Sequence, residues 1–366
     1  MRTAFICYRG FQVLNCINFV YNNIRGTAGS SDIYIVDEFF DDKDIAERLR
    51  KTAIFNKVIL VKDIPDRSLS FNRHFGQVLP KKYLQYRLGL KKEPISDYKQ
   101  LVTCGWNKLF IRYAEFLKGK DIKIIFLDDG IVSYVGNMRD NEYPGLINKK
   151  IKPFFGKGAH SIKIDELYLN NIAQNQSSMV DHVRELPKLV NAKKEFKELL
   201  NYVFGYNEKC LNTKYVFLDQ FTNNDINMEK VISKAALWGK IAAFVPKGEL
   251  LVRLHPHDTG TMDLPGVFFD KKRSLWELVC INEVNDKNVL IGYCSTALIT
   301  PKFIFDEEPI IICLYKLVEF RNKEKAQEID NVFMQLRESY RRKERVIIPG
   351  NITELESVLE KISLLK

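Results

Sequence analysis

Short apolar runs alternate with longer segments of helical period along the 366 residues, and this alternation constrains the fold more than any other feature. In the first half, strands are predicted over 5–6, 33–36, 58–61 and 122–127, and helices over 11–22, 44–51 and 101–118. The last of these strands is apolar except for Lys123, as expected for a strand buried over most of its length. Strands that alternate with helices form parallel sheets through right-handed crossovers. The first half therefore predicts an α/β domain.

A second alternating series follows the polar, turn-rich stretch 205–214. Strands are predicted over 215–218, 250–254, 289–291 and 309–312, and helices over 228–242 and 274–280. The end of the sequence, from Asn351, reads as a capped amphipathic helix. We thus predict two Rossmann-like α/β domains, 1–205 and 215–350, followed by a helix over 351–366. Ligands of open α/β sheets bind at the carboxyl ends of strands, so candidate functional residues are those that follow a strand.

The net charge of +10 indicates anionic partners, yet the 56 Lys and Arg residues are scattered and form no nucleic-acid module, so we expect no nucleic-acid binding. Seven widely spaced cysteines without a C-x-x-C pair indicate a reducing compartment and a cytoplasmic location. No uncharged stretch is long enough to span a bilayer. The segment 149–157 mixes cations with aromatic residues, which is compatible with contact to anionic lipid or with a solvated loop.

Two nucleotide-binding fingerprints are missing: the sequence has neither a G-x-G-x-x-G after its first strand nor a P-loop. A D-x-D occurs within 41–44, where it could hold a metal–diphosphate or simply begin a helix. His74, His160 and His182 have no spacing typical of metal ligands. The sequence therefore points away from dinucleotide and P-loop chemistry and from a metal centre.

The acidic motif Asp128–Asp129–Gly130 directly follows the strand at 122–127. Two adjacent carboxylates raise the pKa of at least one of them, which suits a general base for a sugar hydroxyl. The glycine allows a sharp turn. A polar turn that caps a helix is the alternative interpretation of the same residues.

A histidine motif, His255–Pro256–His257, ends the strand at 250–254. The proline stiffens the turn and helps to present His255, which can donate to a phosphate and stabilise its developing charge. The alternative is a histidine that only packs in a loop.

Two further candidates follow the histidine motif along the chain. Ser295 and Thr296 open a predicted helix, where hydroxyls and backbone N–H groups can bind a phosphate or merely cap the helix. Glu277, after Trp276, could accept hydrogen bonds from two ribose hydroxyls or be a solvated glutamate.

Taken in order, these motifs resemble those of the bacterial sialyltransferases, which share a D/E-D/E-G motif, an H-P motif and a hydroxyl pair. The size and spacing are most similar to glycosyltransferase family 52, whose members sialylate lipooligosaccharide or capsular sugars. The stretches 7–15 and 216–220 also look similar to that group. His257 replaces the Arg or Lys that often follows H-P, Trp276 replaces the proline that often precedes the glutamate, and the hydroxyl pair is Ser-Thr rather than Ser-Ser.

The resemblance implies a GT-B fold, with two Rossmann-like domains facing a central cleft, and an inverting transfer from CMP-sialic acid that needs no metal or other cofactor. Residues 1–205 would bind the oligosaccharide acceptor, with galactose as the expected terminal sugar. Asp128 or Asp129 would take the proton of the acceptor hydroxyl.

Residues 215–350 would bind the donor. His255 would contact the phosphate of CMP and help it to leave, Ser295 and Thr296 would hold that phosphate, and Glu277 would bind the ribose. Gly130 and Pro256 complete the predicted donor-binding set.

Other functions remain open at this level. One is a GT-B transferase that uses CMP-Kdo or a nucleotide-diphosphate sugar, and another is a nucleotide-binding component of capsule assembly without turnover. Peripheral attachment to the inner face of the cytoplasmic membrane, a homodimer, the acceptor and the linkage are also left open.

Overall fold

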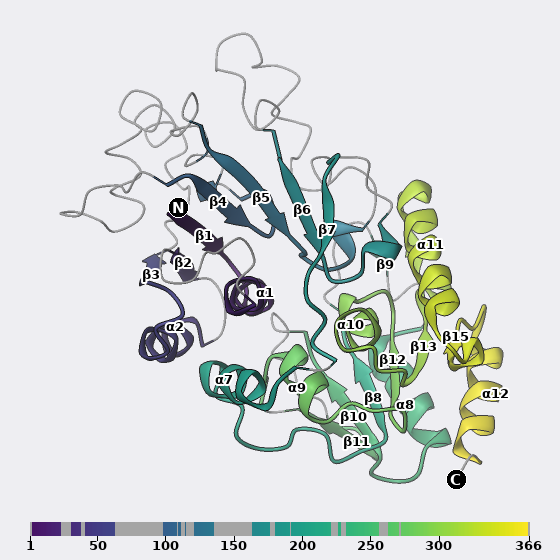
Figure 1. The fold of residues 1–366 in the computed structure, drawn as a ribbon. Helices are drawn as coiled ribbons and strands as arrows, with labels where there is room; N and C mark the ends of the chain where they lie inside the picture. Colours follow the sequence, from purple (N-terminus) through teal and green to yellow (C-terminus); the bar gives the residue numbers. More distant parts are fainter. Residues whose placement is uncertain are drawn as a thin grey trace, which may run out of the picture. The chain divides into compact units, whose positions relative to one another are not determined.

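The computed structural model describes residues 2–22, 31–37, 41–62, 98–107, 109–110, 114, 121–134, 163–175, 180–190, 192–220, 226–227, 232–255, 263–270 and 272–364. Two compact units divide the chain. The first comprises Met1–Pro187 and Glu198–Gly205, and the second comprises Lys188–Lys197 and Tyr206–Lys366. The chain therefore passes between the units three times, after residues 187, 197 and 205. Residues 188–197 belong to the second unit, although residues 198–205, which follow them, belong to the first. Each unit is built around its own sheet (Figure 1).

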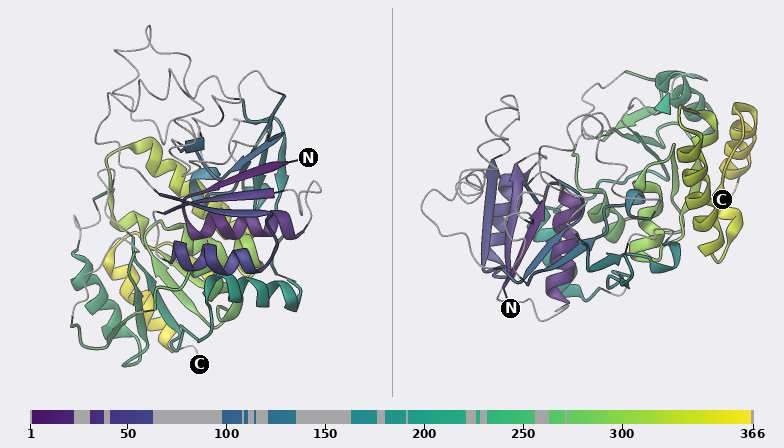
Figure 2. Two further views of the ribbon diagram at one scale, coloured as in Figure 1. Left: turned by 90° about the vertical axis from the view of Figure 1, so that its left-hand side faces the viewer. Right: turned by 90° about the horizontal axis from the view of Figure 1, so that it is seen from above.

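The first unit holds a sheet of seven described strands, in the order β3-β2-β1-β4-β5-β6-β7. All neighbouring strands pair in parallel. The strands are β1 Thr3–Cys7, β2 Ser31–Asp37, β3 Lys57–Lys62, β4 Gln100–Thr103, β5 Lys123–Leu127, β6 Glu166–Leu169 and β7 Val183–Glu185. Helices α1 Gly10–Tyr21 and α2 Asp42–Lys51 lie on the same face of this sheet (Figures 1 and 2). The buried runs of β1, β2 and β5 form its core.

The second unit holds a sheet of six described strands, in the order β11-β10-β8-β12-β13-β15, again with parallel neighbours. The strands are β8 Tyr215–Leu218, β10 Leu250–Arg253, β11 Val267–Phe269, β12 Val289–Gly292, β13 Ile310–Cys313 and β15 Val346–Ile347. Its described helices are α8 Lys234–Phe244, α9 Trp276–Asn282, α10 Thr296–Phe305, α11 Lys323–Ser339 and α12 Ile352–Ser363. A short antiparallel pair joins β9 Ile226–Asn227 to β14 Glu319–Phe320, and helix α7 Lys194–Phe204 runs from the second unit into the first.

These two sheets confirm the predicted fold class, since the chain consists of two successive Rossmann-like α/β units of the kind found in a GT-B chain. The predicted helix over 101–118 is wrong at its start, because Gln100–Thr103 form strand β4 between β1 and β5. All four residues are buried there, and a stretch this short, with two apolar residues between two polar ones, cannot be assigned to helix or strand by period alone. Strands β6, β7, β11 and β15 and helix α11 were not predicted.

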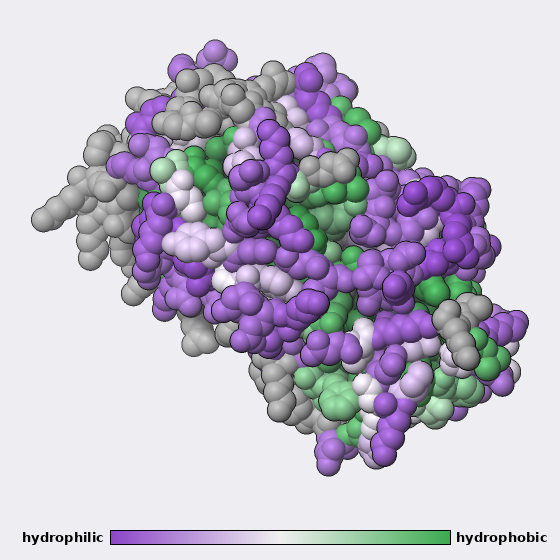
Figure 3. All heavy atoms as spheres, turned by 60° about the horizontal axis from the view of Figure 1, so that its bottom comes forward, coloured by the Kyte–Doolittle hydropathy of each residue, from purple (hydrophilic) through white to green (hydrophobic). Residues whose placement is uncertain are grey.

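The surface drawn in Figure 3 is mainly hydrophilic, with hydrophobic side chains showing in patches between the polar ones. No helix among the described ranges combines the length and the hydropathy that a membrane span requires. The segment 149–157, for which lipid contact was considered, lies outside the described residues.

One glycine of the second sheet predicts a measurable packing cost. A Cβ on Gly292, at the carboxyl end of β12, would lie 2.8 Å from the carbonyl oxygen of Leu218 on the paired strand β8. We therefore expect Gly292→Ala to lower the free energy of unfolding by about 1–3 kcal/mol, as overpacking does. A Cβ on Gly239, inside α8, would meet no neighbouring atom within 4 Å, so Gly239→Ala is expected to raise the free energy by about 0.5–1 kcal/mol. Chemical denaturation of both variants measures this difference, and equal midpoints would contradict it.

Candidate functional site

The acidic motif lies at the carboxyl end of β5, a strand flanked by β4 and β6 within the first sheet. Gly130 has φ +85° and ψ −151°, a conformation that favours glycine, and it turns the chain into the 3-10 helix Ile131–Ser133. The sheet therefore presents Asp128 and Asp129 at the edge where ligands of parallel α/β sheets bind.

The carboxylate of Asp128 is buried, with 1% of the residue exposed, and it accepts hydrogen bonds from four donors. Gly130 N–H donates to Oδ1 at 2.7 Å, while Asn170 donates to Oδ2 from both its backbone N–H and its side-chain Nδ2, each at 3.0 Å. The Tyr134 hydroxyl also donates to Oδ2. Burial raises the pKa of Asp128, and the hydrogen bonds oppose that rise. Asp128 thus ties the end of β5 to the end of β6.

Asp129 has a different environment. Its Oδ1 accepts one hydrogen bond, from Gln12 Nε2 at 2.9 Å, and its Oδ2 lies 4.0 Å from the guanidinium of Arg9. Burial raises the pKa of Asp129 to about 6, Arg9 and Gln12 lower it, and Asp128 raises it further. A carboxylate that exchanges a proton near neutral pH, with 9% of its side chain exposed, has the properties of a general base. The structure therefore separates the two carboxylates that the sequence left equivalent.

The start of helix α1 and the residue before it supply further partners of this motif. Arg9, which precedes α1, and Gln12 contact Asp129, and Asn15 Nδ2 donates to the backbone oxygen of Asp128 at 2.9 Å. None of the three was predicted as a site residue. Their only signal in the sequence was the family-like stretch 7–15.

In the second unit, Arg253 at the end of β10 organises the surrounding loops. Its guanidinium donates to the backbone oxygen of Ser274 at 2.6 Å, pairs with Asp270 at 2.6 Å, and lies over the ring of Trp276 at 5.2 Å from its centroid. His255 follows two residues later and is half-buried. Pro256 and His257 lie outside the described residues.

Glu277 lies in the first turn of α9 and is 7% exposed. Burial raises the pKa of Glu277 to about 7, although its own backbone N–H and the charge of Arg253 lower it. The helix N-terminus therefore holds an acidic group that can be neutral or charged near neutral pH.

Ser295 and Thr296 begin helix α10, and both are half-buried. The Ser295 hydroxyl oxygen caps the helix by accepting from Ala297 N–H at 3.3 Å, which leaves the hydroxyl proton available for donation. Trp276 Nε1 donates to the backbone oxygen of Ala297 at 2.8 Å. The N-termini of α9 and α10 are thereby joined, and Arg253 connects the start of α9 to β10.

The structure thus brings the predicted residues together within each unit. Asp128, Asp129 and Gly130 share one edge of the first sheet, whereas His255, Glu277, Ser295 and Thr296 share the carboxyl edge of the second. Among the described residues, no group of three or more His, Cys, Asp or Glu side chains is arranged to hold a metal ion.

Lys234 is a further residue at that carboxyl edge which the sequence did not single out. Its ammonium, with 12% of the side chain exposed, donates to Asp219 Oδ2 at 3.0 Å and to the backbone oxygen of Gln220 at 2.9 Å. Gln220 Oε1 in turn accepts from Cys294 N–H at 3.2 Å. These contacts brace the end of β8 against the end of β12, immediately before Ser295.

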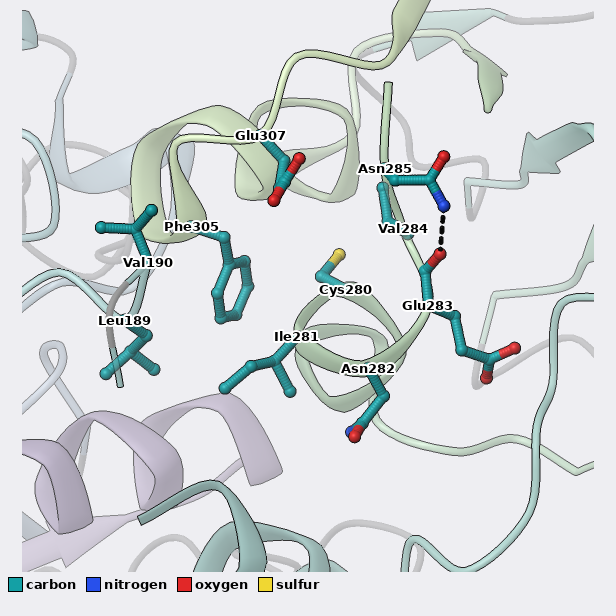
Figure 4. Close-up of a pocket in the computed structure, with 10 residues that line it drawn as sticks. All are labelled: Leu189, Val190, Cys280, Ile281, Asn282, Glu283, Val284, Asn285, Phe305 and Glu307. Carbon is teal, nitrogen blue, oxygen red and sulfur yellow. Dashed lines mark hydrogen bonds between the residues drawn. The ribbon is translucent and has the colours of Figure 1, made fainter. Parts of the chain in front are cut away.

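A pocket of about 190 Å³ lies in the second unit, away from the candidate residues of that unit (Figure 4). Its wall includes the end of α9 and the loop that leads into β12, so it belongs to the opposite edge of the sheet. In Figure 4 the ring of Phe305 lies between Val190 and Ile281. None of the predicted site residues lines this pocket.

Comparisons with known proteins show distant likeness in structure only. No family model matches the chain. No curated protein matches it in sequence. Solved structures that align with it include the UDP-GlcNAc 2-epimerase of Neisseria meningitidis bound to UDP-GlcNAc (11% identity, 100% of both chains, TM-score 0.49). They also include the spinosyn forosaminyltransferase SpnP (10% identity, 99% of this chain and 94% of the other, TM-score 0.46). The MurG of Acinetobacter baumannii aligns at 8% identity, over 100% of this chain and 90% of the other, with a TM-score of 0.43. With TM-scores below 0.5, this likeness carries no argument about the activity of the chain.

Proposed function

We propose that this chain is a GT-B glycosyltransferase, and specifically an inverting sialyltransferase that moves sialic acid from CMP-sialic acid to a sugar hydroxyl of a bacterial surface glycan. The observation that supports it most is the shared edge of the second sheet, where Arg253, Trp276 and Ala297 link the elements that carry His255, Glu277 and Ser295. To bind a cytidine monophosphate group, a site needs a carboxylate that accepts hydrogen bonds from the ribose and several groups that donate hydrogen bonds to the phosphate.

In the proposed reaction, Asp129 takes the proton of the acceptor hydroxyl. The acceptor oxygen then bonds to the anomeric carbon of the sialyl group, and the bond from that carbon to the CMP phosphate breaks with inversion. Asp128 is assigned a structural role, because its four hydrogen-bond donors occupy both carboxylate oxygens.

Charge on the leaving phosphate is stabilised by His255, by the hydroxyls of Ser295 and Thr296, and by the N-terminus of α10. Glu277, as a carboxylate, accepts from the ribose hydroxyls. A monophosphate carries less charge than a diphosphate, so these groups suffice in place of a metal. Pro256 and Gly130 complete the proposed donor-binding set.

The test is transfer by the purified full-length chain from CMP-sialic acid to galactose-terminated acceptors, with product mass and linkage determined. We expect CMP to inhibit and UDP and GDP not to inhibit. Transfer from CMP-Kdo or from a nucleotide-diphosphate sugar instead would identify another donor, and nucleotide binding without turnover would identify a binding component. Either result would overturn the proposal.

His255→Ala is expected to lower kcat by about 10²–10³-fold, as the loss of a donor to developing charge does. His182→Ala is the control, since this histidine is exposed and lies in the first unit. Steady-state kinetics of both variants at saturating acceptor measure the difference. Equal rates for both variants and the wild type would remove His255 from the site.

A further inference from the structure

We propose that Gln12 is the positioning residue of the candidate base, and that it directs Asp129 Oδ2 toward the acceptor proton by holding Oδ1. This inference rests on the proposed transfer reaction. It adds a residue and an atom to that reaction: the amide of Gln12 occupies one carboxylate oxygen, and the other oxygen is left to take the proton.

The amide of Gln12 is held at both ends. Tyr8 N–H donates to its Oε1 at 2.8 Å, and its Nε2 donates to Asp129 Oδ1 at 2.9 Å. Because the backbone donor fixes which end of the amide is the oxygen, the NH₂ group must face the carboxylate. Gln12 is 5% exposed, so the link is shielded from water.

The scaffold around this link is equally constrained. Gln12 lies in the first turn of α1, where Val13 N–H donates to the backbone oxygen of Arg9 at 3.1 Å. On the side of the motif, Asp129 N–H donates to Ser133 Oγ at 2.7 Å, and Asn15 holds the backbone oxygen of Asp128. With the backbone of the motif fixed on both sides, the remaining freedom of Asp129 is rotation of its carboxylate, and the Gln12 bond restricts that rotation.

Other titratable groups also face Asp129, and each must be separated from Gln12 in a test. Arg9, just before α1, lowers the pKa of Asp129, and Asp128 raises it. Tyr134 reaches the motif through its bond to Asp128, and Cys104, after β4, interacts electrostatically with both aspartates. Gln12 is uncharged, so replacing it changes hydrogen bonding while leaving the charges of these groups in place.

The chosen variant is Gln12→Met, which keeps a long unbranched side chain and removes the amide donor. We expect kcat to fall by about 10–100-fold while KM for the acceptor changes little, because ground-state binding is untouched and the base is misdirected. The acid limb of the kcat–pH profile should move to higher pH, since a donor that favours the carboxylate has been lost. Asn18→Leu removes the bond from Asn18 Nδ2 to the backbone oxygen of Pro187, away from the acidic motif, and is the matched control on the same helix.

A readout independent of catalysis is the ¹³C NMR titration of the Asp129 carboxyl, assigned with Asp129→Asn. The titration is expected to move to higher pH in Gln12→Met and to stay in place in Asn18→Leu. Should Gln12→Met fail to fold, Gln12→Leu also removes the amide donor without adding a charge, and it is expected to shift the titration in the same direction. An unmoved titration in a folded variant overturns the role of Gln12. Absence of transfer in the wild type, with the titration shifted as expected, would instead overturn the proposed reaction alone.

Discussion

Asp129→Asn is expected to abolish most of the transfer activity while making the protein more stable. The expected loss of kcat is about 10²–10⁴-fold, which is the usual contribution of a general base. The gain in stability follows from burial, since the folded protein raises the pKa of Asp129 from 3.8 to about 6 and so disfavours the carboxylate. An amide of the same shape carries no charge and avoids this cost.

The pH dependence of that gain follows from linkage. Between pH 3.8 and about 6 the folded state keeps a proton that the unfolded state has released, so the free energy of unfolding of the wild type falls as pH rises through this range. Above pH 6 the cost is constant, at about 3 kcal/mol. Asp129→Asn should therefore be more stable than the wild type by up to that amount at pH 8 and by little at pH 4, as measured by chemical denaturation at both values.

Asp128→Ala provides the contrast, because this substitution leaves Gly130 N–H and both Asn170 donors without their acceptor in a buried site. We expect the free energy of unfolding to fall by about 3 kcal/mol, because buried donors that have lost their acceptor are still removed from water and no hydrogen bond offsets that cost. A loss of activity in this variant would reflect the loop, whereas in Asp129→Asn it would reflect the chemistry. Full activity in Asp129→Asn, or a loss of stability at pH 8, would contradict the assignment of the base.

Asp128 and Asp129 show which part of the candidate site can be predicted from the sequence and which part cannot. Asp128 and Asp129 directly follow a buried apolar strand in the sequence. Because ligands of parallel sheets bind at the carboxyl ends of the strands, this position alone predicts that both residues lie at such an edge. The difference between them depends on Asn170, 42 residues away, and on Gln12, 117 residues away. Contacts at such separations are products of the tertiary fold, and neither spacing nor residue type in one sequence indicates them.

The strands of the first sheet also differ in whether they can be predicted from the sequence. Strand β5 was predicted from its apolar run, whereas β6 was missed because it begins with Glu166, a charged residue that reads as surface. Glu166 is nevertheless buried at 3% exposure, since Lys123 of β5 and Arg184 of β7 pair with its carboxylate at 2.9 and 3.3 Å. Burial of this charge becomes possible only once the neighbouring strands supply both cations.

Glu277→Gln is expected to weaken binding of CMP by about 10–100-fold. Hydrogen bonds from the two ribose hydroxyls to a charged carboxylate contribute about 1.5–3 kcal/mol to the free energy of binding, and the substitution removes that charge. The measurement is calorimetric titration of CMP at pH 8, where the wild-type group is charged, since burial raises the pKa of Glu277 to about 7. Affinity of the wild type should fall more steeply than affinity of the variant as pH decreases through 7, because protonation of the CMP phosphate affects both proteins whereas protonation of Glu277 affects the wild type alone.

Glu277→Gln should also stabilise the protein, because it removes a carboxylate whose charged form is disfavoured by burial. Its pKa of about 7, against an ordinary 4.5, means that the folded state disfavours the carboxylate by about 3 kcal/mol above pH 7, and that this cost develops between pH 4.5 and 7. Glu360→Gln makes the same chemical change at an exposed position of α12 and should alter neither property. A variant at 277 that binds CMP like the wild type, or whose added stability is the same at pH 5 and pH 8, would contradict the role given to this carboxylate. The proposed recognition of a ribose at the N-terminus of α9 would account for a buried acid that lowers the stability of the fold.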